Sequence, residues 1–87
     1  MVKGTVIIKN ETGLQLDAAG AFCDEAVKYR SEITFQKGTY SGNAKSIISV
    51  IGGCVVKGDA IDIVCDGEDE EEAFKGIKEA VEAGLGE

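Results

Sequence analysis

Histidine is absent from this sequence of 87 residues, and cysteine is scarce. Without an imidazole, the chain lacks the side chain that most often serves as a general base near neutral pH and that commonly binds zinc. Its three cysteines, Cys23, Cys54 and Cys65, are widely spaced and odd in number, so neither a disulfide framework nor a zinc motif is predicted. No acid–base pair, phosphate-binding loop or Cys/His dyad is recognisable. We therefore expect a protein that is not an enzyme and that uses no metal or other cofactor.

Long apolar runs and excess positive charge are missing as well. No stretch approaches the length of a membrane span, and the first residues lack the apolar run of a secretory signal, so we expect a cytoplasmic protein. Lysine and arginine number 9 against 16 aspartates and glutamates, which gives a formal net charge of −7. This charge repels nucleic acids and anionic membrane surfaces. The expected partners are therefore proteins, and neither nucleic acid nor membrane.

What is present is the composition of a small globular domain. Hydrophobic residues make up 44% and charged residues 29% of the chain, which is typical of folded proteins. A chain of 87 residues can bury one modest core but not two. We expect a single domain over residues 1–87.

The spacing of apolar residues predicts two elements in the first third of the chain. Alternation over residues 2–8 predicts a strand with one face inward. From Leu16 the spacing becomes helical and predicts an amphipathic helix that ends near Tyr29, with Asp24 and Lys28 paired on its outer face. The apolar stripe of this helix contains Ala19, Phe22, Cys23, Ala26 and Val27.

The rest of the chain predicts a hairpin, a short helix, a strand and a last helix. Residues 32–36 alternate and are followed by a Lys-Gly turn and a short strand from Tyr40. Six residues from Ser46 suit a buried strand, but a serine N-cap precedes them and two glycines follow, so a short helix is favoured. Residues 60–66 alternate as a strand, and residues 68–84 predict a helix. The acidic run that opens this helix is interpreted as stabilising the positive end of the helix dipole and not as an interaction tag.

Two of the cysteines fall on apolar faces of these elements. Cys23 lies on the helix stripe and Cys65 continues the alternation of its strand, so both are expected in the core. Cys54 stands beside two glycines at the end of the short helix and is the one whose exposure has to be tested.

The predicted order is strand, helix, strand, strand, short helix, strand, helix. It indicates an α+β open-faced sandwich in which helices cover one face of a four-stranded, mostly antiparallel sheet. The same order without its last helix also suits a ferredoxin-like module, so element order alone does not decide the family.

Three segments resemble the landmarks of the HPr family, the phosphocarriers of the bacterial sugar phosphotransferase system. Residues 12–19, Thr-Gly-Leu-Gln-Leu-Asp-Ala-Ala, are similar to its active-site segment, Gly-Leu-His-x-Arg-Pro-Ala. Residues 43–48, Asn-Ala-Lys-Ser-Ile-Ile, resemble its regulatory-serine segment, and residues 67–70 resemble the landmark before its last helix. The similarity extends from about residue 2 to residue 83. It implies the HPr-like fold, with three helices on one face of a four-stranded antiparallel sheet.

At the active-site segment the resemblance implies a loss of function. Gln15 stands where the family has its phosphorylated histidine, and a carboxamide nitrogen has no nucleophilic lone pair to accept a phosphoryl group. Asp17 replaces the family's arginine and Ala18 its proline, so an anion stands where a cation would steady the phosphoryl group. Asp17 is not expected to be phosphorylated itself, because no acidic cluster is present to hold Mg²⁺. The active site is therefore degenerate, with no catalytic residue.

Ser46 has two interpretations. As a helix N-cap it needs no further role. In HPr proteins of low-GC Gram-positive bacteria, however, the corresponding serine is phosphorylated by an ATP-dependent HPr serine kinase/phosphorylase, and the phosphoprotein then binds a catabolite-control regulator. One branch of the family carries glutamine at the active-site position and retains only this serine switch, as Gln15 and Ser46 suggest here. A phosphate on Ser46 is expected to face Asp17, a like-charge contact that disfavours it.

Two functions follow from the resemblance. One is a regulatory protein of carbon catabolite repression with a switch at Ser46, and the other is a phosphorylation-independent binding module or vestigial HPr-like domain. In both, the expected partner surface comprises Gln15, Asp17, Ile47, Ile48 and Ile51. Because a six-residue helix has to bury some of its isoleucines in the core, we expect one or two of them to point outward.

Overall fold

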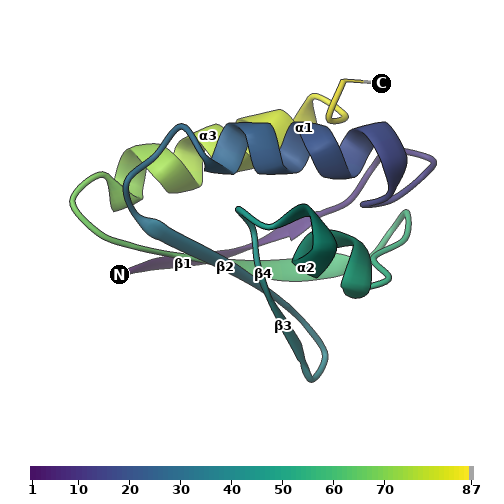
Figure 1. Ribbon diagram of the computed structural model, residues 1–87, viewed down its shortest axis with the longest axis horizontal. Coiled ribbons are helices and arrows are strands. Elements are labelled where there is room, and N and C mark those ends of the chain that lie inside the picture. The colour runs from purple at the N-terminus through teal and green to yellow at the C-terminus, as the bar shows by residue number, and fades with distance from the viewer. Residues whose placement is uncertain (87) are drawn as a thin grey trace.

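The computed structural model describes residues 1–86, and of Leu16 the backbone alone; Glu87, the last residue of the predicted domain, lies outside the described residues. Figure 1 shows the elements in the predicted order of strands and helices. The short element after Ser46 is a helix, as favoured. The elements are β1 (Val2–Ile7), α1 (Leu16–Ala26), β2 (Glu32–Lys37), β3 (Tyr40–Asn43), α2 (Ile47–Gly52), β4 (Ala60–Asp66) and α3 (Glu70–Glu82).

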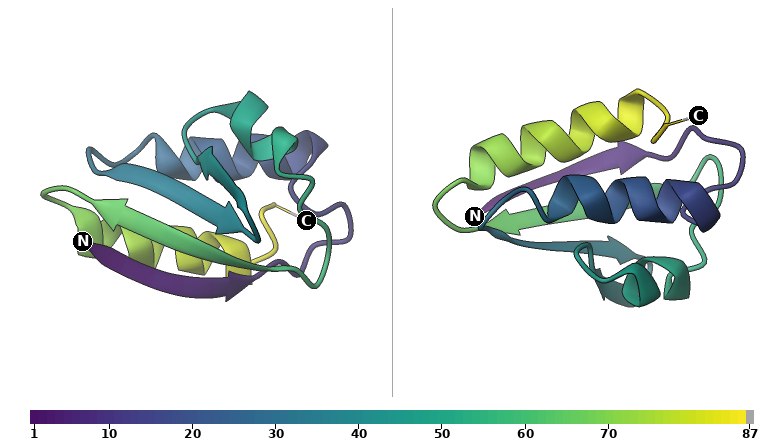
Figure 2. Two further views of the ribbon diagram at one scale, coloured as in Figure 1. Left: turned by 90° about the horizontal axis from the view of Figure 1, so that it is seen from below. Right: turned by 45° about the horizontal axis from the view of Figure 1, so that its top comes forward.

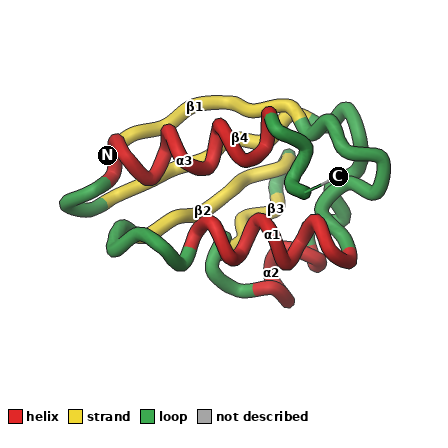
Figure 3. Tube along the Cα trace, turned by 90° about the horizontal axis from the view of Figure 1, so that it is seen from above, coloured by secondary structure: helices red, strands yellow, loops and turns green. Residues whose placement is uncertain are grey.

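The strands within residues 1–86 form one four-stranded antiparallel sheet in the order β1-β4-β2-β3. Helices α1 and α3 lie over one face of it, and α2 packs beside α1 against β3 (Figure 1, Figure 3). The other face is uncovered, as the view from below shows (Figure 2, left). The predicted α+β open-faced sandwich is confirmed. None of the helices described is long and apolar enough to cross a membrane.

The core lies between the covered face of the sheet and the helices. Alternate residues of the strands point into it, which is the consequence of the two-residue repeat of a strand. At its centre Phe22 of α1 meets Phe35 of β2 edge to face, with ring centroids 6.0 Å apart. Cys23 and Cys65 are buried there, as predicted, and burial raises the pKa of both thiols. They are packing residues and poor nucleophiles.

Helix α1 was predicted to end near Tyr29, but it ends at Ala26. After Ala26 the chain tightens, and the Tyr29 amide donates to the carbonyl three residues earlier, at 3.3 Å. The Tyr29 carbonyl accepts a hydrogen bond from Lys45 Nζ at 2.7 Å, which fixes the departing chain to the segment before α2. Val27, which the helical spacing had placed on the buried stripe, is therefore 58% exposed.

The predicted pair between Asp24 and Lys28 is also wrong. Lys28 pairs with Glu25, at 2.9 Å, because the Glu25 carboxylate also accepts from the Tyr29 hydroxyl at 2.7 Å. Burial raises the pKa of Glu25, but the hydrogen bonds from Tyr29 and Lys28 together outweigh it and lower the pKa. The same bond to Glu25 raises the pKa of Tyr29 to about 12. Gly76 of α3 makes room for this phenol, since a Cβ there would lie 1.9 Å from its oxygen.

The remaining boundaries shift by one or two residues. β1 ends at Ile7 instead of residue 8, although Ile8 is buried. α3 ends at Glu82 instead of residue 84, because Gly84 takes a φ of +87°, which breaks the right-handed helix.

Candidate functional site

Gln15 immediately precedes α1 in an extended conformation, with φ −134° and ψ 162°. Its carbonyl accepts the first amides of the helix, from Ala18 at 3.2 Å and Ala19 at 3.4 Å. Its side chain makes no capping hydrogen bond, and the residue is exposed. The carboxamide is thus free to donate to a partner and to accept from it.

The loop that carries Gln15 is fixed to the segment after α2. Leu14 donates its amide to the Val55 carbonyl at 3.0 Å. Gly13 has a φ of +63°, and a Cβ there would lie 2.2 Å from the same carbonyl oxygen. Only glycine fits both the left-handed backbone and this approach. The loop and the segment after α2 therefore form one rigid unit.

Asn10 stabilises the start of this loop, a role that was not predicted from the sequence. Its side chain is buried, and Nδ2 donates to the Gly13 carbonyl and to the Thr12 hydroxyl. Its Oδ1 has no partner among the described residues. The signal was present in the Asn-x-x-Gly spacing, because asparagine side chains commonly bond the backbone of the turn that they open.

Asp17 and Ala18 follow Gln15 but face in different directions. Asp17 lies exposed in the first turn of α1, and no ion pair or hydrogen bond joins its carboxylate to another described residue. Ala18 is 3% exposed and belongs to the core. Of the residues predicted at the degenerate site, Gln15 and Asp17 are thus available to a partner. Over residues 1–86 no cluster of Asp, Glu and Cys is arranged to hold a metal ion.

Ser46 caps α2, as predicted. Its Oγ accepts the Ser49 amide at 3.3 Å, and the residue remains partly exposed. The Ser49 carbonyl accepts the Tyr40 hydroxyl at 2.7 Å, so both backbone groups of Ser49 are fixed. Lys45, next to Ser46, donates its ammonium to the Tyr29 carbonyl beyond the end of α1, as described above. Ser46 is therefore partly exposed to solvent while its hydroxyl caps the helix.

All three predicted isoleucines of α2 are exposed: Ile47 46%, Ile48 81% and Ile51 44%. The expectation that only one or two would point outward is wrong. The helix is anchored by Val50, which is fully buried, and by Gly53, whose Cβ position would lie 3.0 Å from the Phe35 ring. Because the glycines let the backbone itself lie on the aromatic rings, no isoleucine is needed as an anchor.

Helices α1 and α2 lie side by side, with the Gln15 end of α1 near α2 (Figure 2, right; Figure 3). The structure therefore places side by side the two segments that carry the predicted partner residues. Cys54, at the end of α2, is exposed and has a φ of +50°. We define the docking face as Gln15, Asp17, Ile47, Ile48 and Ile51.

The family model for the PTS HPr component phosphorylation site matches residues 2–83. The chain belongs to the HPr family. The HPr-like protein Crh of Halalkalibacterium halodurans is 36% identical over 77 residues, covering 88% of this chain and 92% of that protein. The phosphocarrier protein HPr of Mycoplasma capricolum is 35% identical over 81 residues, covering 93% and 91%.

Solved structures of HPr proteins have the same fold. HPr-C-His from Thermoanaerobacter tengcongensis superposes with a TM-score of 0.97 at 37% identity, covering 100% of this chain and 98% of that one. Crh from Bacillus subtilis superposes with a TM-score of 0.77 at 32% identity, covering 97% of each chain. These matches place the chain in a phosphotransferase-system family that includes both HPr and Crh. The family membership and the HPr-like fold expected from the three landmarks are confirmed.

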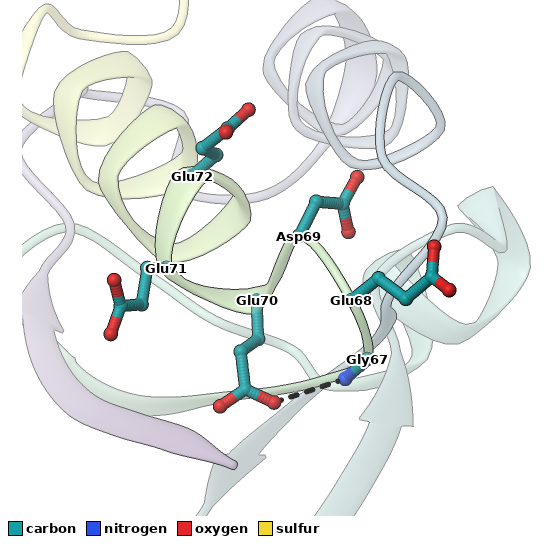
Figure 4. Close-up of a pocket in the computed structure, with 6 residues that line it drawn as sticks. All are labelled: Gly67, Glu68, Asp69, Glu70, Glu71 and Glu72. Carbon is teal, nitrogen blue, oxygen red and sulfur yellow. Dashed lines mark hydrogen bonds between the residues drawn. The ribbon is translucent and has the colours of Figure 1, made fainter.

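In this HPr-family chain the acidic run before α3 has structural partners. Asp69 accepts the amides of Arg30 and Ser31, each at 2.9 Å, and the Ser31 hydroxyl, whose hydrogen bond is the main reason that the pKa of Asp69 falls to about 2. Glu70 pairs with the N-terminal ammonium of Met1 at 2.7 Å and accepts the Gly67 amide at 3.2 Å (Figure 4).

Residues 67–72 line an open hollow of about 300 Å³ at this turn. Their carboxylates diverge instead of converging on one point (Figure 4). Glu70, Glu71 and Glu72 occupy the first turn of α3, where negative charge is favourable. The hollow is therefore part of the support of the fold and lies apart from the docking face.

Proposed function

We propose that this chain is a regulatory, non-enzymatic HPr-family protein of the cytoplasm that takes part in carbon catabolite control through a phosphorylation switch at Ser46. Its partners would be an HPr serine kinase/phosphorylase and a catabolite-control regulator. The observation that carries the proposal is the partly exposed Ser46 beside three exposed isoleucines, in a chain without histidine.

The same observations argue against a phosphocarrier. Transfer through the family's active site needs an imidazole nitrogen, and the residue at the N-terminal end of α1 is Gln15. The amide nitrogen of Gln15 is conjugated with its carbonyl and is not nucleophilic. Its exposed carboxamide is suited to hydrogen bonding with a partner protein. Phosphoryl transfer from phosphoenolpyruvate through enzyme I should therefore not occur.

The geometry of Ser46 is compatible with phosphorylation. A phosphoryl group adds a charge of about −1.5 to −2 and three acceptor oxygens. One of these oxygens can take over the Ser49 amide that Oγ now accepts, so α2 need not unfold. The exposed Ile47 and Ile48 follow directly and offer a partner apolar surface beside the phosphate. A regulator can thus recognise charge and apolar area at one place.

A second candidate is a binding module that does not depend on phosphorylation. The cap bond from Ser49 favours it, because this bond alone accounts for a serine at the start of α2. The exposed Asp17 of α1, the helix that packs beside α2, favours it too, since a carboxylate on a neighbouring element opposes the charge of a phosphoserine.

The deciding experiment is incubation with ATP and the HPr serine kinase, followed by intact-mass measurement. We expect one added phosphate that disappears in Ser46→Ala and persists in Ser49→Ala, the neighbouring partly exposed serine. No incorporation would favour the phosphorylation-independent module. In a parallel reaction with phosphoenolpyruvate and enzyme I, an increase in mass would refute the loss of carrier function.

A further inference from the structure

The outer ridge of α1 next to the docking face carries two unpaired carboxylates. Asp17, Gly20, Ala21 and Asp24 follow one another at the spacing that brings residues to one face of a helix. Asp17 and Asp24 are exposed, and neither forms an ion pair or hydrogen bond with another residue of the described chain. A Cβ on Gly20 would meet nothing within 4 Å, so between the two acids the ridge is low and open.

Four lysines that flank α1 or α2 have partners other than Asp17 and Asp24. Three of them are paired with other carboxylates, and the ammonium of Lys45 donates to a backbone carbonyl, so none of the four forms an ion pair with Asp17 or Asp24. The contacts are Lys28 with Glu25 at 2.9 Å, Lys37 with Asp59 at 3.0 Å, Lys57 with Glu11 at 2.6 Å, and Lys45 with the Tyr29 carbonyl at 2.7 Å. The surface around the isoleucines is therefore apolar with an acidic edge.

We propose that this surface binds a partner protein that covers the three isoleucines with apolar side chains and places lysine or arginine opposite Asp17 and Asp24. The inference rests on the docking face of the proposed function and adds the charge of its partner. Burial of Ile47, Ile48 and Ile51 supplies affinity, whereas the two carboxylates select the partner. A protein with acidic residues at these places is rejected, because like charges brought together at an interface are unfavourable.

An amide NMR titration with two synthetic peptides tests the proposal. Both peptides form amphipathic helices with the same leucine face, and the polar face carries lysine in one and glutamate in the other. We expect the lysine peptide to shift the amides of α1 and α2, and the glutamate peptide to bind more weakly. Replacing both acids, Asp17→Asn with Asp24→Asn, should weaken the binding of the lysine peptide by about two- to thirtyfold, the range for two exposed ion pairs.

A matched control separates the position of the charge from its amount. Glu32→Gln with Asp66→Asn removes the same two negative charges from a cross-strand pair on the uncovered face of the sheet, and should leave the affinity unchanged. Equal binding of the two peptides, equal effects of the two double variants, or no binding of either peptide would overturn the inference.

The variant Ile48→Ser distinguishes this failure from a failure of the docking face. If Ile48→Ser weakens the binding of both peptides equally while the charge variants have no effect, the docking face binds partners but does not select their charge. If it has no effect on a peptide that binds, the docking face itself is refuted, whatever the outcome of the kinase experiment at Ser46.

Discussion

Replacement of Gly13 by alanine tests the rigid unit formed by the Gln15 loop and the segment after α2. The added Cβ would lie 2.2 Å from the Val55 carbonyl oxygen and 2.8 Å from the Val56 Cα. Both contacts are with backbone, so the overlap is relieved only by moving the loop. That movement breaks the hydrogen bond from the Leu14 amide to Val55.

The cost has two parts. Placing a Cβ on a left-handed residue costs about 1–2 kcal/mol. Forcing one carbon into a packed contact adds about 1–3 kcal/mol. Gly38 provides the control, because its φ is +58° but a Cβ there would meet nothing within 4 Å. We therefore expect about 2–5 kcal/mol for Gly13→Ala and about 1–2 kcal/mol for Gly38→Ala.

Urea denaturation followed by circular dichroism measures both variants at one temperature. Equal denaturant slopes will show that the variants differ in stability and not in the compactness of the unfolded chain. In amide NMR spectra the resonance of Gln15 should shift in Gly13→Ala but not in Gly38→Ala. If the two variants differ by less than about 0.5 kcal/mol, the size of an ordinary surface effect, the close approach to Val55 does not constrain the loop.

Three further predictions concern the cap and the titrating groups. Ser46→Ala should lower the free energy of unfolding by about 1 kcal/mol, measured in urea, whereas Ser46→Asp should retain the cap. Tyr29 should titrate at about pH 12, followed by its absorbance, and Glu25→Gln should bring it towards 10. Because its pKa is raised on folding, its stabilisation is complete below about pH 10 and is lost between about 10 and 12. Asp69, with a pKa lowered to about 2, stabilises the fold above about pH 4 and loses that effect as the pH falls through 2. Asp69→Asn should abolish this part of the acid transition in circular dichroism, and Asp66→Asn should leave it.

Periodicity predicted the elements because each buries one face along its own length. The caps refined this picture, and Ser46 decided between a short helix and a strand. The end of α1 was not predictable in this way. It depends on Lys45, 16 residues beyond Tyr29, and no local pattern contains that contact. The partner of Lys28 likewise depends on a tertiary contact, because Glu25 lies beside Gly76 of α3.

At the candidate site, the structure agrees with the expected exposure of the residues before and at the start of α1 but not with that of the isoleucines of α2. Gln15 and Asp17 proved exposed because they start a helix at the surface. The exposure of the isoleucines of α2 was predicted wrongly, because this helix is anchored through its backbone. Gly53 packs directly on the Phe35 ring. Hydrophobicity along the chain cannot indicate that a glycine replaces a side chain as the anchor.

The place of β4 in the sheet sets the time at which the molecule can fold. β1 leaves the ribosome well before β4, yet the two strands pair, and Val2 lies opposite Cys65. Its other packing partner is α3, which follows β4. At a synthesis rate of about 5–20 residues per second, β1 waits several seconds with both edges open. The sheet therefore closes only after β4 and α3 have been synthesised, and contacts so distant in sequence make that closure slow for a chain of this size.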